Sequence, residues 1–297
     1  MAPRLSRVPV NSTKQRVKNG AYRGVGSVGR LRPFHPDGLR VLLYHKVNDV
    51  PGNPGSVPTT LFAEHMALIE AEGYRPVSLE DVLAHLRDGA PLPPKATLIS
   101  FDDGYRDNLV GAAPVLQKHG FPAVLFVSVG RIGSKIPFPH DERSGFRNPS
   151  IDWQELTQLE AMGVRVESHG VRHLPLATLT DEEAERELLE SKSRLEEHLG
   201  RPIRAYAYVK GSLADFDARH QEMLRRAGYE AAFTTVTGSN RPGASPYALK
   251  RYNIEPYPTR TLELVLRGAC DAMALKDSRF GTVARRAFNS ALRTASR

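Results

Sequence analysis

The segment Thr97–Gly104, with the sequence TLISFDDG, joins a short apolar run to two adjacent aspartates and a glycine. The apolar run is typical of a buried strand, and the aspartates stand where that strand ends. Two neighbouring carboxylates repel one another, so a cation or hydrogen bonds must stabilise their ionised forms. The alternative is a structural role, in which Asp102 or Asp103 caps a helix that starts near Arg106.

A second polar stretch, Glu167–His173 with the sequence ESHGVRH, follows another apolar run and carries His169 and His173 four positions apart. One aspartate and two histidines are enough protein ligands for a divalent metal with open positions. These ligand types suit Zn²⁺, and also Co²⁺, Ni²⁺ or Mn²⁺. The second aspartate would remain free to act as a base on metal-bound water. Two unrelated surface histidines are the alternative interpretation.

Short apolar runs alternate with helical patterns along the rest of the chain. The strand candidates are 41–44, 97–101, 123–127, 164–167, 205–208, 231–235 and 249–253. The helix candidates are 61–72, 78–86, 151–161, 180–199, 218–227 and 261–268. This alternation predicts βα units and a parallel sheet. We expect an α/β fold, a distorted (β/α) barrel of about seven parallel strands in a single domain.

The candidate residues follow different strands of this barrel. His45 follows the first strand, Asp102 and Asp103 follow the next apolar run, and His169 follows a later one. The carboxyl ends of barrel strands share one rim, where active sites are built. We therefore expect these distant residues to meet there. The long segment 132–150 belongs to the same rim and could fold over a substrate.

The formal charge of +8 is concentrated at the two ends of the 297-residue chain. Residues 1–40 hold nine Lys/Arg and one acid, and residues 281–297 hold four Arg and no acid. We expect a basic, flexible tail over 1–38, the barrel domain over 39–258 and a basic helical extension over 259–297. The ends could contact a membrane surface or an anionic glycan. Nucleic acid is not expected as a partner, because the body lacks basic excess and a recognition motif.

Cysteine usage and hydropathy limit the kinds of metal site and the cellular locations that the sequence predicts. Cys270 is the only cysteine, so neither an intrachain disulfide nor a thiolate-rich metal site can form within one chain. The first 34 residues contain no apolar signal segment, and no stretch has the length of a transmembrane helix. The expected location is therefore cytoplasmic, with membrane-peripheral contact as a further option.

On these motifs the chain resembles the polysaccharide deacetylases of the NodB-homology family, carbohydrate esterase family 4. The first family motif, Thr-Phe-Asp-Asp-Gly, corresponds to Ser100–Gly104 here. The second, close to His-Ser/Thr-x-x-x-His-Pro, corresponds to His169–Leu174. The resemblance extends from about Val41 to Pro256 and is closest in pattern to the poly-N-acetylglucosamine deacetylase branch.

The resemblance implies a role for each matching residue. Asp102 would be the general base, and the metal ligands would be Asp103, His169 and His173. The activated water would attack the carbonyl carbon of an N-acetyl group. A backbone N–H near Tyr105 would help to hold the developing oxyanion, which makes Tyr105 a substrate-binding candidate.

The general acid is where the chain departs from the commonest family pattern. Many relatives supply this acid from a late Leu-x-His motif, but no histidine follows His220 here. The poly-N-acetylglucosamine branch instead has an early Tyr-His pair, which corresponds to Tyr44 and His45. His45 is therefore the candidate acid, and a core or solvent-exposed histidine is the alternative.

The third family motif is also altered. Relatives often read Phe-Ala-Tyr-Pro-Tyr-Gly, whereas Tyr206–Gly211 reads YAYVKG. Tyr208 keeps its place, and Lys210 replaces the second tyrosine, so both are substrate-binding candidates. The added charge of Lys210 either favours a phosphate- or uronate-bearing substrate or indicates reduced activity.

The leading hypothesis is a metal-dependent hydrolase that removes N-acetyl groups from an amino-sugar residue. Its N-acetylated carbohydrate substrate would be a polysaccharide, a glycolipid or a glycan precursor. One alternative is a catalytically impaired carbohydrate-binding protein on the same fold. Another is an amidohydrolase of a small non-sugar amide.

Overall fold

The computed structural model describes residues 20, 24 and 38–271. Most of the predicted basic tail, and the part of the predicted extension beyond residue 271, lie outside these residues. In the described part, no helix has the length and apolar character needed to cross a membrane.

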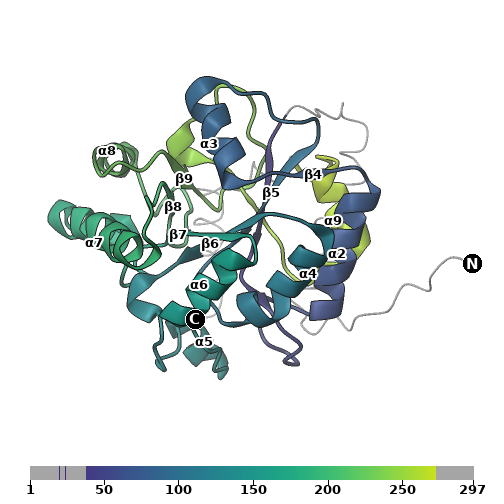
Figure 1. Cartoon of the computed structure of the whole chain (residues 1–297), viewed down its shortest axis with the longest axis horizontal. Helices are drawn as coiled ribbons and strands as arrows, with labels where there is room; N and C mark the ends of the chain where they lie inside the picture. The colour runs from purple at the N-terminus through teal and green to yellow at the C-terminus, as the bar shows by residue number, and fades with distance from the viewer. Residues whose placement is uncertain (1–19, 21–23, 25–37, 272–297) are drawn as a thin grey trace, which may run out of the picture.

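Seven strands form one parallel sheet in the order β10-β1-β5-β6-β7-β8-β9, and β4 pairs with β5 outside this path (Figure 1). A separate parallel pair joins β2 to β3. The bounds are β1 (Arg40–Tyr44), β2 (Lys46–Val47), β3 (Ser56–Val57), β4 (Arg75–Pro76), β5 (Ala96–Phe101), β6 (Ala123–Val127), β7 (Val164–Ser168), β8 (Ala205–Ala207), β9 (Ala231–Phe233) and β10 (Tyr252–Asn253).

The chain segment that contains β10 connects the two ends of this sheet. On one side, Thr234 donates its N–H to the carbonyl of Leu249 at 2.7 Å, next to β9. On the other side, Tyr252 pairs with Leu42 of β1. The sheet therefore curls into the distorted barrel predicted from the sequence. The predicted strand 249–253 is shorter than expected because the chain passes from one edge to the other within it.

Helices surround the curled sheet (Figure 1). They are α2 (Thr59–Ala71), α3 (Leu79–Asp88), α4 (Ala113–His119), α5 (Pro139–Ser144), α6 (Trp153–Ala161), α7 (Asp181–Leu199), α8 (Ala218–Arg226) and α9 (Thr259–Leu266). Side-chain caps start several of them, because the first N–H groups of a helix lack backbone partners. Capping boxes at Ser78 and Thr180 start two of the helices predicted from the sequence.

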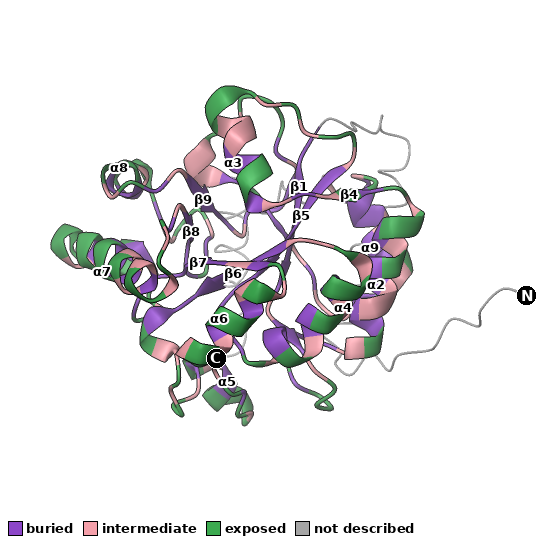
Figure 2. Cartoon of the chain, viewed as in Figure 1, coloured by how far each residue is buried: buried purple, intermediate pink, exposed green. Residues whose placement is uncertain are grey.

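Alternate strand residues pack into two apolar clusters. Val41 and Leu98 belong to the cluster that includes the buried face of α3, whereas Leu42 and Ile99 pack with the surrounding helices. Both faces of the sheet are therefore covered, as expected for parallel strands. The strands are buried while the outer helix faces are exposed (Figure 2). This rigid framework fixes the strand ends that carry the site.

Candidate metal and catalytic site

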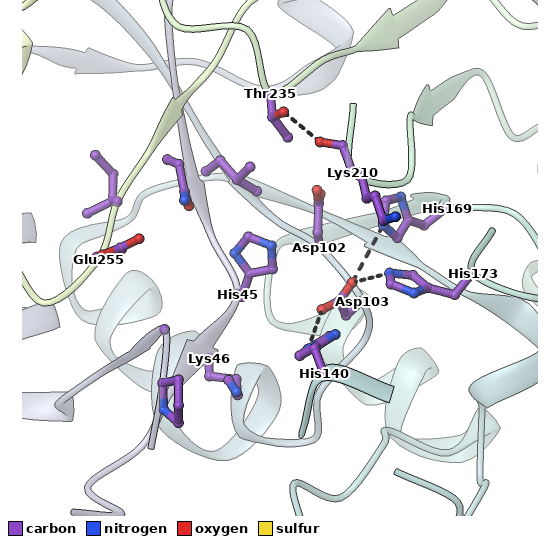
Figure 3. A pocket seen from close by; sticks show the side chains of 15 residues that line it. His45, Lys46, Asp102, Asp103, His140, His169, His173, Lys210, Thr235 and Glu255 are labelled. Carbon is purple, nitrogen blue, oxygen red and sulfur yellow. Dashed lines mark hydrogen bonds and ion pairs between the residues drawn. The ribbon is translucent and has the colours of Figure 1, made fainter. Parts of the chain in front are cut away.

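A cavity of about 420 Å³ opens at the carboxyl ends of the strands (Figure 3). Six of the eight predicted site residues line it: His45, Asp102, Asp103, His169, His173 and Lys210. The strand ends thus bring together residues from distant parts of the sequence, as the barrel prediction required.

Asp103 and the two histidines form a compact set of possible metal ligands, here called the metal triad. The Oδ1 atom of Asp103 lies 2.9 Å from Nε2 of His173 and 3.5 Å from Nε2 of His169. One ligand atom from each residue lies within 4.8 Å of the others. The Nδ1 atom of His169 lies 2.8 Å from the carbonyl of Ala207, so an N–H there leaves Nε2 free for a metal.

The charges of the metal triad fit a divalent cation. Asp103 is only 2% exposed. Burial would raise the pKa of this carboxyl, but His173 and His169 hold it well below its usual range. Burial would likewise lower the pKa of His169, whereas Asp102 and Asp103 keep it above its usual value. A buried carboxylate that faces two imidazole nitrogens suits a zinc-type site.

The backbone around the cavity adopts unusual conformations. Asp103, His173 and Lys210 have φ angles of 78°, 58° and 59°, and Lys95 is the only other non-glycine residue with positive φ in the described part. Such conformations cost about 1–3 kcal/mol each and cluster at functional sites. Beside Asp103, Gly104 has φ of 94°, and a Cβ there would lie 2.5 Å from Cγ2 of Val127.

Asp102 does not join the metal triad but forms a bidentate ion pair with Arg251. Both terminal nitrogens of Arg251 donate to the two carboxylate oxygens at 2.7 Å. Burial would raise the pKa of Asp102, but the Arg251 guanidinium keeps it below its usual value. The helix-cap alternative is wrong for both aspartates, because the helical segment that follows starts after Asp107. Sequence reasoning missed Arg251, whose one signal was a charge inside a predicted strand.

His45 lines the same cavity from the end of β1. Burial lowers the pKa of His45, although the nearby carboxylates of Asp103 and Asp102 raise it in part. Its backbone carbonyl accepts a hydrogen bond from Nδ2 of Asn108 at 2.9 Å, which fixes the position of the residue. The imidazole is half-buried and lies within the field of both aspartates.

Comparison with known proteins agrees with this geometry. The family model described as polysaccharide deacetylase matches residues 89–232. YxkH of Bacillus subtilis (strain 168), which is named for the same family, is 28% identical over 226 residues, or 76% of this chain and 75% of that protein. Residues 89–232 of this chain belong to the polysaccharide deacetylase family.

Two further comparisons place this deacetylase domain among its relatives. Poly-beta-1,6-N-acetyl-D-glucosamine N-deacetylase of Escherichia coli (strain K12) is 30% identical over 136 residues, which cover 43% of this chain and 20% of that relative. The structure of IcaB from Ammonifex degensii matches with 25% identity and a TM-score of 0.67, over 78% of this chain and 97% of that one. As a family member, the chain is a hydrolase of N-acetyl amide bonds.

A fourth histidine, which sequence reasoning did not include in the site, reaches the deacetylase cavity from the long rim segment. Nε2 of His140 lies 3.8 Å from Oδ2 of Asp103, and the side chain is 41% exposed. The Tyr105 hydroxyl donates to Asp141 at 2.8 Å and lies 2.7 Å from Nε2 of His140. Because the single hydroxyl proton of Tyr105 is donated to Asp141, the Tyr105 oxygen accepts the Nε2–H of His140. A buried Lys46–Asp141 ion pair at 2.8 Å anchors this segment.

The two predicted tyrosines do not line the deacetylase cavity. Tyr105 is fully buried and reaches the cavity only through His140. Tyr208 stacks on Phe216 with ring centroids 4.1 Å apart, and its hydroxyl donates to the carbonyl of Tyr247 at 3.1 Å. Tyr105 therefore supports His140, whereas Tyr208 packs in the apolar core.

Lys210 stands at the mouth of the deacetylase cavity. Its side chain is exposed, and no carboxylate pairs with its ammonium among the described residues. Its carbonyl accepts a hydrogen bond from Oγ1 of Thr235 at 2.6 Å, which holds the backbone of the altered third motif. The charge that the sequence indicated is therefore available to a ligand at this mouth.

Proposed function

We propose that this chain is a metal-dependent N-deacetylase that removes acetyl groups from an amino-sugar residue of a glycan. The observation that carries the proposal is Asp102, a buried carboxylate held by Arg251 beside the metal triad but outside it. A site that only bound metal would have no use for this second carboxylate. The name of the Escherichia coli relative supports an N-acetylglucosamine polymer as the substrate class.

Asp103, His169 and His173 would hold the cation, and their ligand types favour Zn²⁺, with Co²⁺, Ni²⁺ or Mn²⁺ as alternatives. When bound, such a cation activates water and polarises the amide carbonyl. Asp103 and His169 are buried and His173 is half-buried, and their ligand atoms already lie within 4.8 Å of one another, so the set needs little rearrangement.

Asp102 accepts the proton of the attacking water in this proposal. Arg251 has two effects on it. The bidentate pair fixes the orientation of the carboxylate, and the positive charge keeps the carboxylate ionised, as the lowered pKa of Asp102 indicates. An ionised carboxylate in a fixed position is what a general base requires.

His45 donates the proton to the leaving amine nitrogen in this proposal. It lines the cavity within the field of Asp102 and Asp103, whose charges offset part of the burial that lowers the pKa of His45. Lys210 faces the open mouth, where it can attract an acidic group elsewhere on the substrate.

The experiment that tests this function combines metal analysis with an acetate-release assay on N-acetylglucosamine oligomers. Asp102→Asn should retain metal and lose acetate release by several orders of magnitude, because the amide cannot accept the proton. Retained turnover in this variant would contradict the proposal. A wild-type protein that binds metal but releases no acetate from neutral, phosphate-bearing or uronate-bearing N-acetylated sugars would instead support the carbohydrate-binding alternative.

A further inference from the structure

We propose that Glu187, on α7, is a positioning residue for the metal triad and acts through the backbone between His169 and His173. The inference rests on the proposed metal site but not on the proposed substrate. Glu187 is 4% exposed and does not line the cavity. Its carboxylate contacts the backbone between His169 and His173, here called the histidine loop, without lining the cavity itself.

The carbonyl groups of this loop are held by the chain that follows β6. Val129 donates its N–H to the carbonyl of Gly170 at 2.9 Å, and Gly130 donates to the carbonyl of Val171 at 3.0 Å. Buried backbone groups need such partners, because an unpaired one costs as much as a lost hydrogen bond. One side of the loop is thereby fixed without any side chain.

The N–H groups of the loop are held by Glu187. The Oε2 atom of Glu187 accepts from the N–H of Val171 at 2.7 Å and from the N–H of Arg172 at 3.0 Å. The Oε1 atom accepts from Nε of Arg172. A single carboxylate thus binds two successive N–H groups with charge-assisted hydrogen bonds, which are stronger than neutral ones.

The fit between the carboxylate and the loop is close. Gly170 has φ of 76°, and a Cβ there would lie 3.1 Å from Oε2 of Glu187 and 3.2 Å from the hydroxyl of Tyr206. The next metal ligand, His173, has φ of 58°. Because the two N–H groups held by Glu187 immediately precede His173, the carboxylate helps to fix the strained turn that aims this imidazole at Asp103.

Substitutions of Glu187 separate positioning from simple charge. Glu187→Gln loses the charge but keeps an oxygen that both N–H groups can reach. Glu187→Asp keeps the charge but is one methylene too short to reach them. If Glu187 positions the loop, metal affinity should be highest in the wild type and lower in Glu187→Gln. It should be lowest, and about equal, in Glu187→Asp and Glu187→Ala.

The test uses the full-length apoprotein, with Co²⁺ titrated and followed by its visible spectrum and Zn²⁺ measured by competition with a chelator. Glu187→Ala should bind either ion about 10- to 100-fold more weakly, and its Co²⁺ spectrum should change because the His173 ligand is misplaced. The matched control is Glu160→Ala. Glu160 on α6 also accepts a backbone N–H, that of Val166 at 2.9 Å, and pairs with the Arg201 guanidinium. This control should lower stability and leave metal affinity unchanged.

Three results would overturn the inference. The first is a Glu187→Ala protein with the metal affinity and Co²⁺ spectrum of the wild type. The second is a Glu160→Ala protein that binds metal as weakly as Glu187→Ala, and the third is a Glu187→Asp protein that binds metal like the wild type while Glu187→Gln does not. A wild-type protein that binds neither ion would refute the metal site itself. Normal metal binding without acetate release would refute only the proposed reaction.

Discussion

Arg251 and Asp102 are 149 positions apart in the sequence and form a buried bidentate ion pair, with both N–O distances at 2.7 Å. The guanidinium also donates from Nε to the carbonyl of Thr234 at 2.8 Å, so its plane is fixed by three hydrogen bonds. The carboxylate next to the metal triad is therefore both oriented and neutralised by the residue that immediately precedes β10.

Replacing Arg251 by lysine should lower kcat by roughly ten- to hundredfold. An ammonium keeps the charge but cannot make both hydrogen bonds, and one charged hydrogen bond contributes about 1.5–3 kcal/mol. Arg251→Met should in addition cost about 3–5 kcal/mol of unfolding free energy, since it leaves a buried carboxylate unpaired. Kinetics and denaturant unfolding measure the two effects.

The matched control for that substitution is Arg40→Lys. Arg40 is also buried, and it pairs with Asp271 at 3.1 Å outside the cavity. This control should reduce stability without changing kcat. An Arg251→Lys enzyme with the wild-type kcat would show that the orientation of Asp102 does not limit the reaction.

Removing the Tyr105 hydroxyl should raise KM about fivefold, with little change in kcat or metal content. Tyr105→Phe frees His140, which lines the cavity beside the metal triad, and one hydrogen bond is worth about 1 kcal/mol. In a His140→Ala background, Tyr105→Phe should have little further effect on KM. Tyr208→Phe is the control, because its hydroxyl bonds a backbone carbonyl away from the cavity. Equal KM changes in both tyrosine variants would argue against a role for His140.

His65 should make the protein less stable as the pH falls from about 6.5 to 4. Burial lowers the pKa of His65 to about 4, and its ring lies between the Tyr44 hydroxyl and the carbonyl of Tyr257. Between these pH values the unfolded chain takes up a proton that the folded chain does not, which costs at most about 3 kcal/mol. Above pH 6.5 neither state binds this proton, so the effect disappears.

The measurement is the unfolding free energy of the wild type minus that of His65→Gln, across this pH range. The difference should decrease as the pH falls. Asp107 acts with the opposite sign, since burial raises its pKa to about 6, but its contribution is common to both proteins and cancels. A difference that stays constant with pH would show that His65 is not held neutral.

The barrel and most of the cavity could be predicted because they depend on local signals. Apolar runs alternate with capped helices, and the ligand motifs stand where apolar runs end, so Asp103 and His169 could be placed on one rim. Arg251 could not be found in this way, because its partner is distant and no local spacing marks a buried ion pair. His140 lies in a segment whose path depends on the buried Lys46–Asp141 pair.

Side-chain direction was the other property that the sequence did not determine. Tyr208 keeps its motif position, yet its ring is buried away from the cavity. The ring of Tyr105 is buried too, while the oxyanion role of a backbone N–H near Tyr105 stays a prediction. A motif places a residue near a strand end, but the packing of its neighbours decides which way the side chain points. Phe216, which stacks on Tyr208, had no signal in that motif.

The position of Arg251 in the segment that joins the sheet's two ends has a consequence for synthesis on the ribosome. A nascent chain that has emerged only as far as β9 already contains every residue of the metal triad, but Asp102 still lacks its counter-charge. The segment that carries Arg251 must therefore be made and docked before Asp102 gains its ion-pair partner.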